Sequence, residues 1–185
     1  GIKENNRFKG HQGEIQSVNF NSDGTRLVTV GKDGFVILWN LKGEQLAKFQ
    51  AHSSSMSKYS VSFSPNNQYI VTEVSTGVSN LIRLWDLEGN QLGEEFAIKL
   101  INPFYYGSSS VSFNSNGEKI VVLGTDGTAH LRNSRGELLK KLKVQNNDII
   151  NVTFSPDGSK IATVAATVGD TCLLYTSPSP RDKRL

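Results

Sequence analysis

The chain has 185 residues, of which 37% are hydrophobic, 9% aromatic and 20% charged, and its formal net charge at pH 7 is +3. It contains one cysteine and three histidines, a content that argues against a disulfide-stapled scaffold and a Cys/His zinc site. No run of about 18 apolar residues occurs, so we expect no membrane-spanning helix and no membrane partner.

The first clear unit of the chain runs from Gly10 to Asn40. Residues 15–20 alternate apolar and polar side chains, whereas 27–30 and 35–39 are nearly continuous β-branched and aromatic runs. Asp-Gly pairs separate these runs, at points where a tight hairpin requires the positive φ that glycine adopts freely. A fourth run, 44–50, follows a Lys-Gly turn. The unit is therefore predicted to be a four-stranded antiparallel meander.

The same unit carries a characteristic order of residues. Gly-His precedes the first strand, and V-x-F, Ser-Asp-Gly, a second-strand threonine, Asp-Gly and Trp-Asn follow. This order resembles a WD repeat, one blade of a β-propeller. In that family a loop His, a second-strand Ser or Thr, a turn Asp and a third-strand Trp form a hydrogen-bonded structural tetrad. The resemblance places it at His11, Thr29, Asp33 and Trp39. A buried indole N–H or imidazole without a partner costs about 1–3 kcal/mol, so we expect these groups to bond to one another.

Further copies of the unit follow along the chain. The phenylalanine that ends the first strand recurs at Phe20, Phe63, Phe113 and Phe154, at intervals of 43, 50 and 41 residues. Such intervals are typical of propeller blades. We therefore predict an all-β fold, a β-propeller fragment of about three and a half four-stranded antiparallel blades. The expected partial propeller covers 1–171, with blades at about 8–50, 51–96 and 97–142 and an incomplete blade at 143–171.

The second copy keeps three of the four tetrad positions. They are His52, Thr72 and Trp85. Thr72 and Trp85 are 13 residues apart, compared with 10 for the first pair, and Ser79 stands where the aspartate is expected. We therefore predict an enlarged turn at 73–80.

The remaining copies are more degenerate. The third keeps Asp126 but has Val122 at the threonine position, Arg132 at the tryptophan position and no histidine before its first strand, so its tetrad is predicted to be absent. The fourth keeps two strands and Thr163 before the pattern is lost.

Both ends of the chain affect its interpretation. The family usually closes roughly six to eight blades into a ring, so we interpret the chain as a fragment. Residues 172–182, CLLYTSPSPRD, match the translation of a transposase sequencing adapter residue for residue. Residues 172–185 are therefore interpreted as a non-native tail. This tail holds the only cysteine and accounts for two of the three net positive charges.

No residue pattern indicates catalysis or cofactor binding. His11 and Asp33 lie near hydroxyls, as in a nucleophilic triad, but no G-x-S-x-G elbow accompanies them. Glu94 and Glu95 are adjacent and would point to opposite faces of a strand, unlike a glycosidase pair. A Gly-rich phosphate loop and an HExxH motif are also missing. We expect no catalytic, cofactor-binding or metal-binding residue.

Two segments bear on partners. Phe104, Tyr105 and Tyr106 replace the Gly-His loop of the third copy and are candidate partner-binding residues; alternatively, they fill the space left by the missing His and Trp of that blade. The run 138–143, LLKKLK, is interpreted as an outer strand whose lysines discourage edge pairing. We therefore expect one or more protein partners of unidentified kind and no nucleic acid.

The function expected from the resemblance is a non-catalytic scaffold for protein interactions, or a sensor arm of a larger cytoplasmic protein of bacterial or cyanobacterial type. One alternative is the sensor domain of a signalling NTPase. A second is an enzymatic propeller such as a lactonase or glycosidase, which needs acids or histidines on several inner strands. The first-strand segments IQSVNF, YSVSF, SSVSF and INVTF contain neither.

Overall fold

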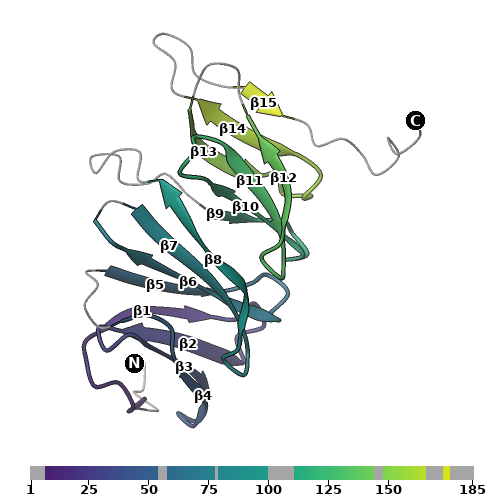
Figure 1. Ribbon diagram of the computed structural model, residues 1–185. Coiled ribbons are helices and arrows are strands. Elements are labelled where there is room, and N and C mark those ends of the chain that lie inside the picture. Colours follow the sequence, from purple (N-terminus) through teal and green to yellow (C-terminus); the bar gives the residue numbers. More distant parts are fainter. Residues whose placement is uncertain are drawn as a thin grey trace, which may run out of the picture. The chain divides into compact units, whose positions relative to one another are not determined.

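The computed structural model describes residues 7–53, 58–77, 79–99, 111–143, 148–165 and 173–175. Within these ranges every regular element is a β-strand (Figure 1), and none is a helix that could cross a membrane. The strands are β1 Ile15–Phe20, β2 Arg26–Gly31, β3 Phe35–Asn40, β4 Gln45–Gln50, β5 Lys58–Phe63, β6 Tyr69–Ser75, β7 Ser79–Asp86, β8 Gln91–Lys99, β9 Val111–Phe113, β10 Lys119–Leu123, β11 Ala129–Asn133, β12 Leu138–Leu142, β13 Ile149–Phe154, β14 Ile161–Ala165 and β15 Leu173–Tyr175.

The strands form four sheets, each made of consecutive strands in chain order. The orders are β1-β2-β3-β4, β5-β6-β7-β8, β9-β10-β11-β12 and β13-β14-β15. This repeated antiparallel meander confirms the predicted all-β propeller fragment, and we call the four sheets blades 1 to 4. The chain divides into two compact units, Gly1–Phe96 and Ala97–Leu185, and each is described by itself.

The Asp-Gly turns adopt the conformation that the sequence predicts. Gly24, between β1 and β2, has φ 69°, and Gly34, between β2 and β3, has φ 76°. At Gly34 a side chain would also collide with the carbonyl oxygen of His52. Glycine at this position therefore allows both the turn and the close approach of the chain that enters blade 2.

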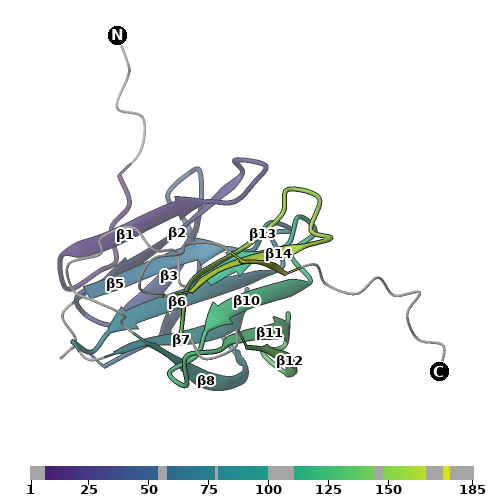
Figure 2. The same ribbon diagram turned by 90° about the horizontal axis from the view of Figure 1, so that it is seen from above.

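The core of the first unit lies between blades 1 and 2. One face of β2 and β3 presents Val28, Val30, Val36 and Leu38, all at most 2% exposed, to the facing side chains of blade 2. The residues of blade 2 in this core are Tyr59, Val61, Phe63, Ile70, Val74 and Trp85. Accordingly, β5 lies beside β1 in both views (Figures 1 and 2).

A side chain of one blade caps the backbone of the next in both units. The Oδ1 of Asn19 in β1 accepts a hydrogen bond from the N–H of Phe63 in β5, at 3.2 Å. The Oγ of Ser112 in β9 accepts one from the N–H of Phe154 in β13, at 3.1 Å. Each acceptor stands one residue before the phenylalanine that ends its own first strand, so the repeat in the sequence corresponds to a repeated contact.

An aromatic ring covers each tryptophan of the first unit. Phe8 packs edge-on against Trp39, with ring centroids 5.5 Å apart, and Phe49 of β4 packs on Trp85 at 4.9 Å. Each phenylalanine precedes its blade's tetrad histidine by three residues. The first unit therefore repeats its packing in detail, including the segment that leads into each blade.

The β6–β7 hairpin of blade 2 corrects one expectation. The extra residues at 73–80 extend the ladder instead of enlarging the turn: three residue pairs follow Thr72 in the β6–β7 ladder, whereas one follows Thr29 in the β2–β3 ladder. The last pair joins Ser75 to Asn80. Val74 is 0% exposed. The longer strands therefore bury an additional apolar residue, which an enlarged turn would leave in water.

Blade 4 contains a third strand that the sequence assigns to the tail. The backbone of Leu173–Tyr175 pairs with β14, with Leu173 opposite Thr163. Such pairing uses main-chain groups and requires no particular sequence. The non-native origin of residues 172–185 and the blade boundaries stay predictions.

Candidate functional site

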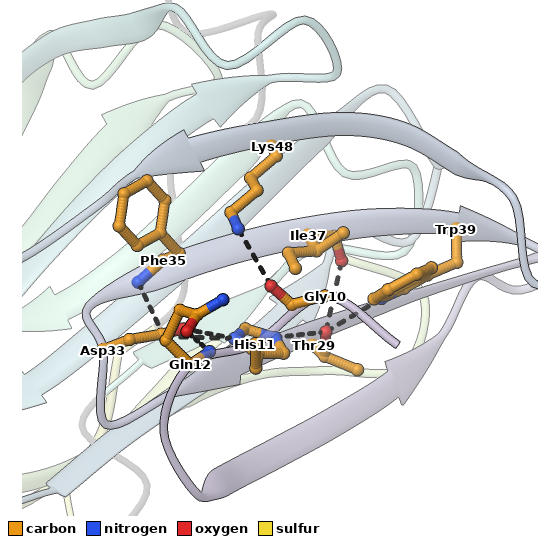
Figure 3. Close-up of polar contacts among 9 residues, drawn as sticks. All are labelled: Gly10, His11, Gln12, Thr29, Asp33, Phe35, Ile37, Trp39 and Lys48. Atoms are coloured by element: carbon orange, nitrogen blue, oxygen red, sulfur yellow. Dashed lines mark hydrogen bonds and ion pairs between the residues drawn. The ribbon is translucent and has the colours of Figure 1, made fainter. Parts of the chain in front are cut away.

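A chain of hydrogen bonds joins four segments of blade 1 (Figure 3). Nδ1 of His11, in the loop before β1, lies 3.0 and 3.1 Å from the two carboxylate oxygens of Asp33 in the β2–β3 turn. Nε2 of His11 lies 2.8 Å from Oγ1 of Thr29 in β2. The indole N–H of Trp39 in β3 donates to the same Oγ1, at 2.9 Å. The structure thus brings all four residues of the first predicted tetrad together.

The directions of these bonds are mutually consistent. The carboxylate of Asp33 accepts from the Nδ1–H of His11, so Nε2 of a neutral imidazole is an acceptor. The hydroxyl of Thr29 then donates to Nε2, while its oxygen accepts the indole N–H of Trp39. Each polar group in this first chain has a partner, and Thr29 is 3% exposed.

The carboxylate of Asp33 is held by several donors. Burial alone would raise its pKa, but hydrogen bonds from the backbone N–H of Gln12, the imidazole of His11 and the backbone N–H of Phe35 outweigh burial. The pKa of Asp33 therefore lies below its ordinary value, and the carboxylate is ionised at neutral pH.

Gly31 lies directly beneath the His–Asp pair. A Cβ at this position would lie 2.7 Å from Nδ1 of His11 and 2.8 Å from Oδ1 of Asp33. The equivalent residue of blade 3, Gly124, would meet Asp126 and His130 in the same way. Sequence reasoning missed this requirement, although a glycine two residues after the second-strand position, where an aspartate follows in the turn, is a readable signal.

Blade 2 contains a second, shorter chain. Nε2 of His52 lies 2.9 Å from Oγ1 of Thr72, and the indole N–H of Trp85 donates to that oxygen, also at 2.9 Å. Ser79, at the expected aspartate position, contacts Thr76 within its own turn, with the two hydroxyl oxygens 3.2 Å apart.

A guanidinium stands near this second chain. Arg83 in β7 pairs with Thr72 in the ladder, the position that Ile37 holds opposite Thr29 in blade 1. Nε and Nη2 of Arg83 each lie 2.6 Å from Glu95 of β8. Burial lowers the pKa of His52 to about 4, and the charge of Arg83 contributes to the decrease.

Blade 3 lacks the tetrad, as its sequence predicts. Val122 stands at the threonine position but has no hydroxyl, and Arg132 stands at the tryptophan position but has no indole. Asp126 contacts His130 of β11 instead, at 3.2 and 3.3 Å, and Nζ of Lys141 at 2.8 Å. Sequence reasoning missed this cluster because its histidine comes from the third strand.

The first chain has the order of a catalytic triad but not its accessibility. Asp33, His11 and Thr29 follow one another as acid, base and hydroxyl. A nucleophile must reach a substrate, however, and the hydroxyl of Thr29 is buried and already bonded to Trp39. Among the described residues no three His, Cys, Asp or Glu side chains could hold a metal ion together. Phe104, Tyr105 and Tyr106 lie outside the described residues.

Comparison with known proteins agrees with this geometry. The family described as WD domain, G-beta repeat matches residues 2–40 and 43–86, which include both hydrogen-bond chains. These two segments of the chain match WD repeats. Blades 1 and 2 thus carry the WD pattern in sequence and in contacts, whereas in blade 3 the tetrad positions are substituted.

Proteins from several eukaryotes are similar to this chain. The WD repeat-containing protein SL1-17 of Schistosoma mansoni is 25% identical over 86% of the chain and 50% of its own length. The target of rapamycin complex subunit wat1 of Schizosaccharomyces pombe is likewise 25% identical, over the same shares. The small ribosomal subunit protein RACK1z of Arabidopsis thaliana is 33% identical over 49% of the chain and 26% of its own length. The chain spans half or less of these relatives.

Proposed function

We propose that this WD-repeat chain is a non-catalytic scaffold segment that binds protein partners through the loops at one end of its blades. The observation that carries the proposal is a set of three loops, 11–14, 32–34 and 51–53, which we call the loop cluster. The backbone N–H of Gln12 donates to Asp33 at 2.7 Å, and Nζ of Lys32 lies 2.5 Å from Glu14. The N–H of His52 donates to the carbonyl of Gly34 at 3.1 Å.

The loop cluster separates inward-facing from outward-facing groups. The side chains of its two histidines and of Asp33 form hydrogen bonds within the blades. The exposed residues of the cluster are Gln12, Glu14, Lys32 and Ser53. Loops that are already ordered lose less conformational entropy when they bind. A fixed array of exposed polar side chains is therefore suited to recognition.

The similar proteins support binding rather than catalysis. The names of the Arabidopsis and Schizosaccharomyces relatives describe a ribosomal subunit protein and a subunit of a complex. Proteins are the proposed partners rather than nucleic acids, because Lys141 in the basic run of β12 is paired with Asp126. The finer form of the proposal is a sensor arm within a larger cytoplasmic protein.

Affinity capture tests the proposal. The immobilised chain is exposed to a lysate of cells that express the protein, and captured proteins are quantified by mass spectrometry. The double variant Glu14→Lys/Lys32→Glu keeps the ion pair but reverses the surface charges, and we expect it to reduce partner recovery about tenfold, the effect of roughly 1.4 kcal/mol. Tyr105→Ala/Tyr106→Ala tests the aromatic candidates separately.

Lys42→Glu is the matched control. Lys42 is exposed in the β3–β4 turn, and successive turns of a meander lie at opposite ends of the sheet, so this turn is at the other end from the β2–β3 turn. Recovery should be unchanged. Equal recovery by all variants would contradict binding through the loops.

A further inference from the structure

The two hydrogen-bond chains of the first unit differ in the charge beside their histidines. His11 has the carboxylate of Asp33 at 3.0 Å from Nδ1. In blade 2, Arg83 replaces the apolar Ile37 at the equivalent ladder position. A cation therefore stands near His52 where blade 1 has an uncharged side chain.

The guanidinium of Arg83 is fixed in place near His52. Its Nη1 donates to the carbonyl oxygen of Ala51, the residue before His52, and Glu95 of β8 holds its other nitrogens. From β5, the ring of Tyr59 faces the imidazole, with centroids 6.0 Å apart. Among the described groups around His52, Arg83 is the cation, Glu95 is engaged by it, and Tyr59 contributes an aromatic ring.

Protonation has different consequences in the two chains. We assign neutral His52 the tautomer of His11, in which Nε2 accepts the hydroxyl proton of the threonine. An imidazolium at position 52 would carry a proton on Nε2 and would have to donate it to Oγ1 of Thr72. The hydroxyl proton of Thr72 would then lose its acceptor in a site that is 0% exposed. An imidazolium at position 11 would instead form an ion pair with Asp33, and the hydroxyl of Thr29 has the carbonyl of Ile37 within 3.5 Å.

His52 also lies at the junction of two blades. The N–H groups of Ala51 and His52 both donate to the carbonyl of Gly34 in the β2–β3 turn, at 2.9 and 3.1 Å. A change at His52 is therefore transmitted to the contact between blades 1 and 2 and to the loop cluster.

We propose that His52 is an acid-sensitive latch: when it is protonated, the Trp85–Thr72–His52 chain opens and loop 51–53 loosens from blade 2, while the chain of blade 1 stays closed. The pKa of His52 is lowered from 6.5 to about 4, so the folded state favours the neutral form. The stabilisation is complete above the unfolded-state value and is lost progressively as the pH falls from about 6.5 toward 4.

The two tryptophans of the chain report on the two blades separately. In a ¹⁵N-labelled full chain each indole N–H gives one NMR signal, and Trp39→Phe or Trp85→Phe assigns them. During a titration from pH 7.5 to 3.5, we expect the Trp85 signal to shift and exchange faster with solvent below about pH 5. The indole N–H of Trp39 should keep its slow exchange with solvent throughout the titration, because the chain of blade 1 stays closed. Simultaneous loss of slow exchange at both indoles, or a constant Trp85 signal, would overturn the proposal.

Two variants identify the cause. Replacing the imidazole in His52→Gln keeps an acceptor for Thr72 but removes the titration, so the Trp85 signal should no longer depend on pH. Arg83→Ile installs the residue of blade 1, and we expect the midpoint of the Trp85 transition to rise by about 0.5 pH unit. If the Trp85 transition persists in His52→Gln, another group titrates. If the midpoint is unchanged in Arg83→Ile, the charge of Arg83 does not lower the pKa of His52.

Discussion

A single threonine hydroxyl connects two otherwise separate polar side chains in each of the first two blades. Oγ1 of Thr29 lies within 2.9 Å of both His11 and Trp39, and Oγ1 of Thr72 does the same for His52 and Trp85. The buried indole and imidazole nitrogens would otherwise be unsatisfied, so each hydroxyl stabilises more than its own residue.

The tryptophan and its blade 3 counterpart should differ in their contribution to stability. Trp39 is 0% exposed, so Trp39→Ala is expected to lower the free energy of unfolding by about 3–5 kcal/mol through cavity formation. Arg132→Ala should cost less, about 1 kcal/mol, because this partly buried side chain gives up a hydrogen bond from Nη1 to the carbonyl of Gly136, at 2.7 Å, and leaves a smaller cavity. Urea unfolding followed by circular dichroism measures both values, and equal losses would show that the two positions are not distinguished by their hydrogen bonds.

At the scale of the element, the β2–β3 turn depends on the absence of a side chain at Gly31. The His–Asp pair occupies the space that a Cβ would take. In blade 2 the aspartate is missing, and Val74 occupies the equivalent place with 0% exposure. Glycine is therefore required at this position by the hydrogen-bond chain and not by the turn conformation.

Gly31→Ala should destabilise blade 1 by about 1–3 kcal/mol, because the added methyl group forces His11 and Asp33 apart. The same substitution in an Asp33→Ala background should cost less, since the carboxylate no longer competes for the space. A double-mutant cycle from urea unfolding gives the coupling. If Gly31→Ala lowers the free energy of unfolding equally in both backgrounds, the added methyl group is accommodated without breaking the hydrogen bonds between His11 and Asp33.

At the scale of the whole molecule, local features of the sequence predict the strands well. The Asp-Gly turns, the alternation in 15–20 and the spacing from Thr29 to Trp39 are set by neighbours in the chain, and the strands form where these patterns lie. The same spacing rule failed at 73–80, because burial of Val74 extended the strands.

Contacts that depend on cross-strand register could not be predicted in the same way. Arg83 of β7 reaches Glu95 of β8, and Lys141 of β12 reaches Asp126, through strands whose alignment emerges only when the sheets form. These contacts distinguish blades 2 and 3 from blade 1. The sequence pattern therefore identifies the repeat, while the register determines how each copy departs from it.

The central claim is that the first hydrogen-bond chain stabilises the blade. Its most direct test is the free energy of unfolding of Thr29→Val, which preserves shape and β-branching but removes the hydroxyl. We predict a loss of about 2–4 kcal/mol, because the indole N–H of Trp39 and Nε2 of His11 both lose the hydroxyl that is their hydrogen-bond partner. The control Thr153→Val, at an exposed position in β13, should change stability by less than about 0.5 kcal/mol. Equal small changes in the two variants would contradict the claim.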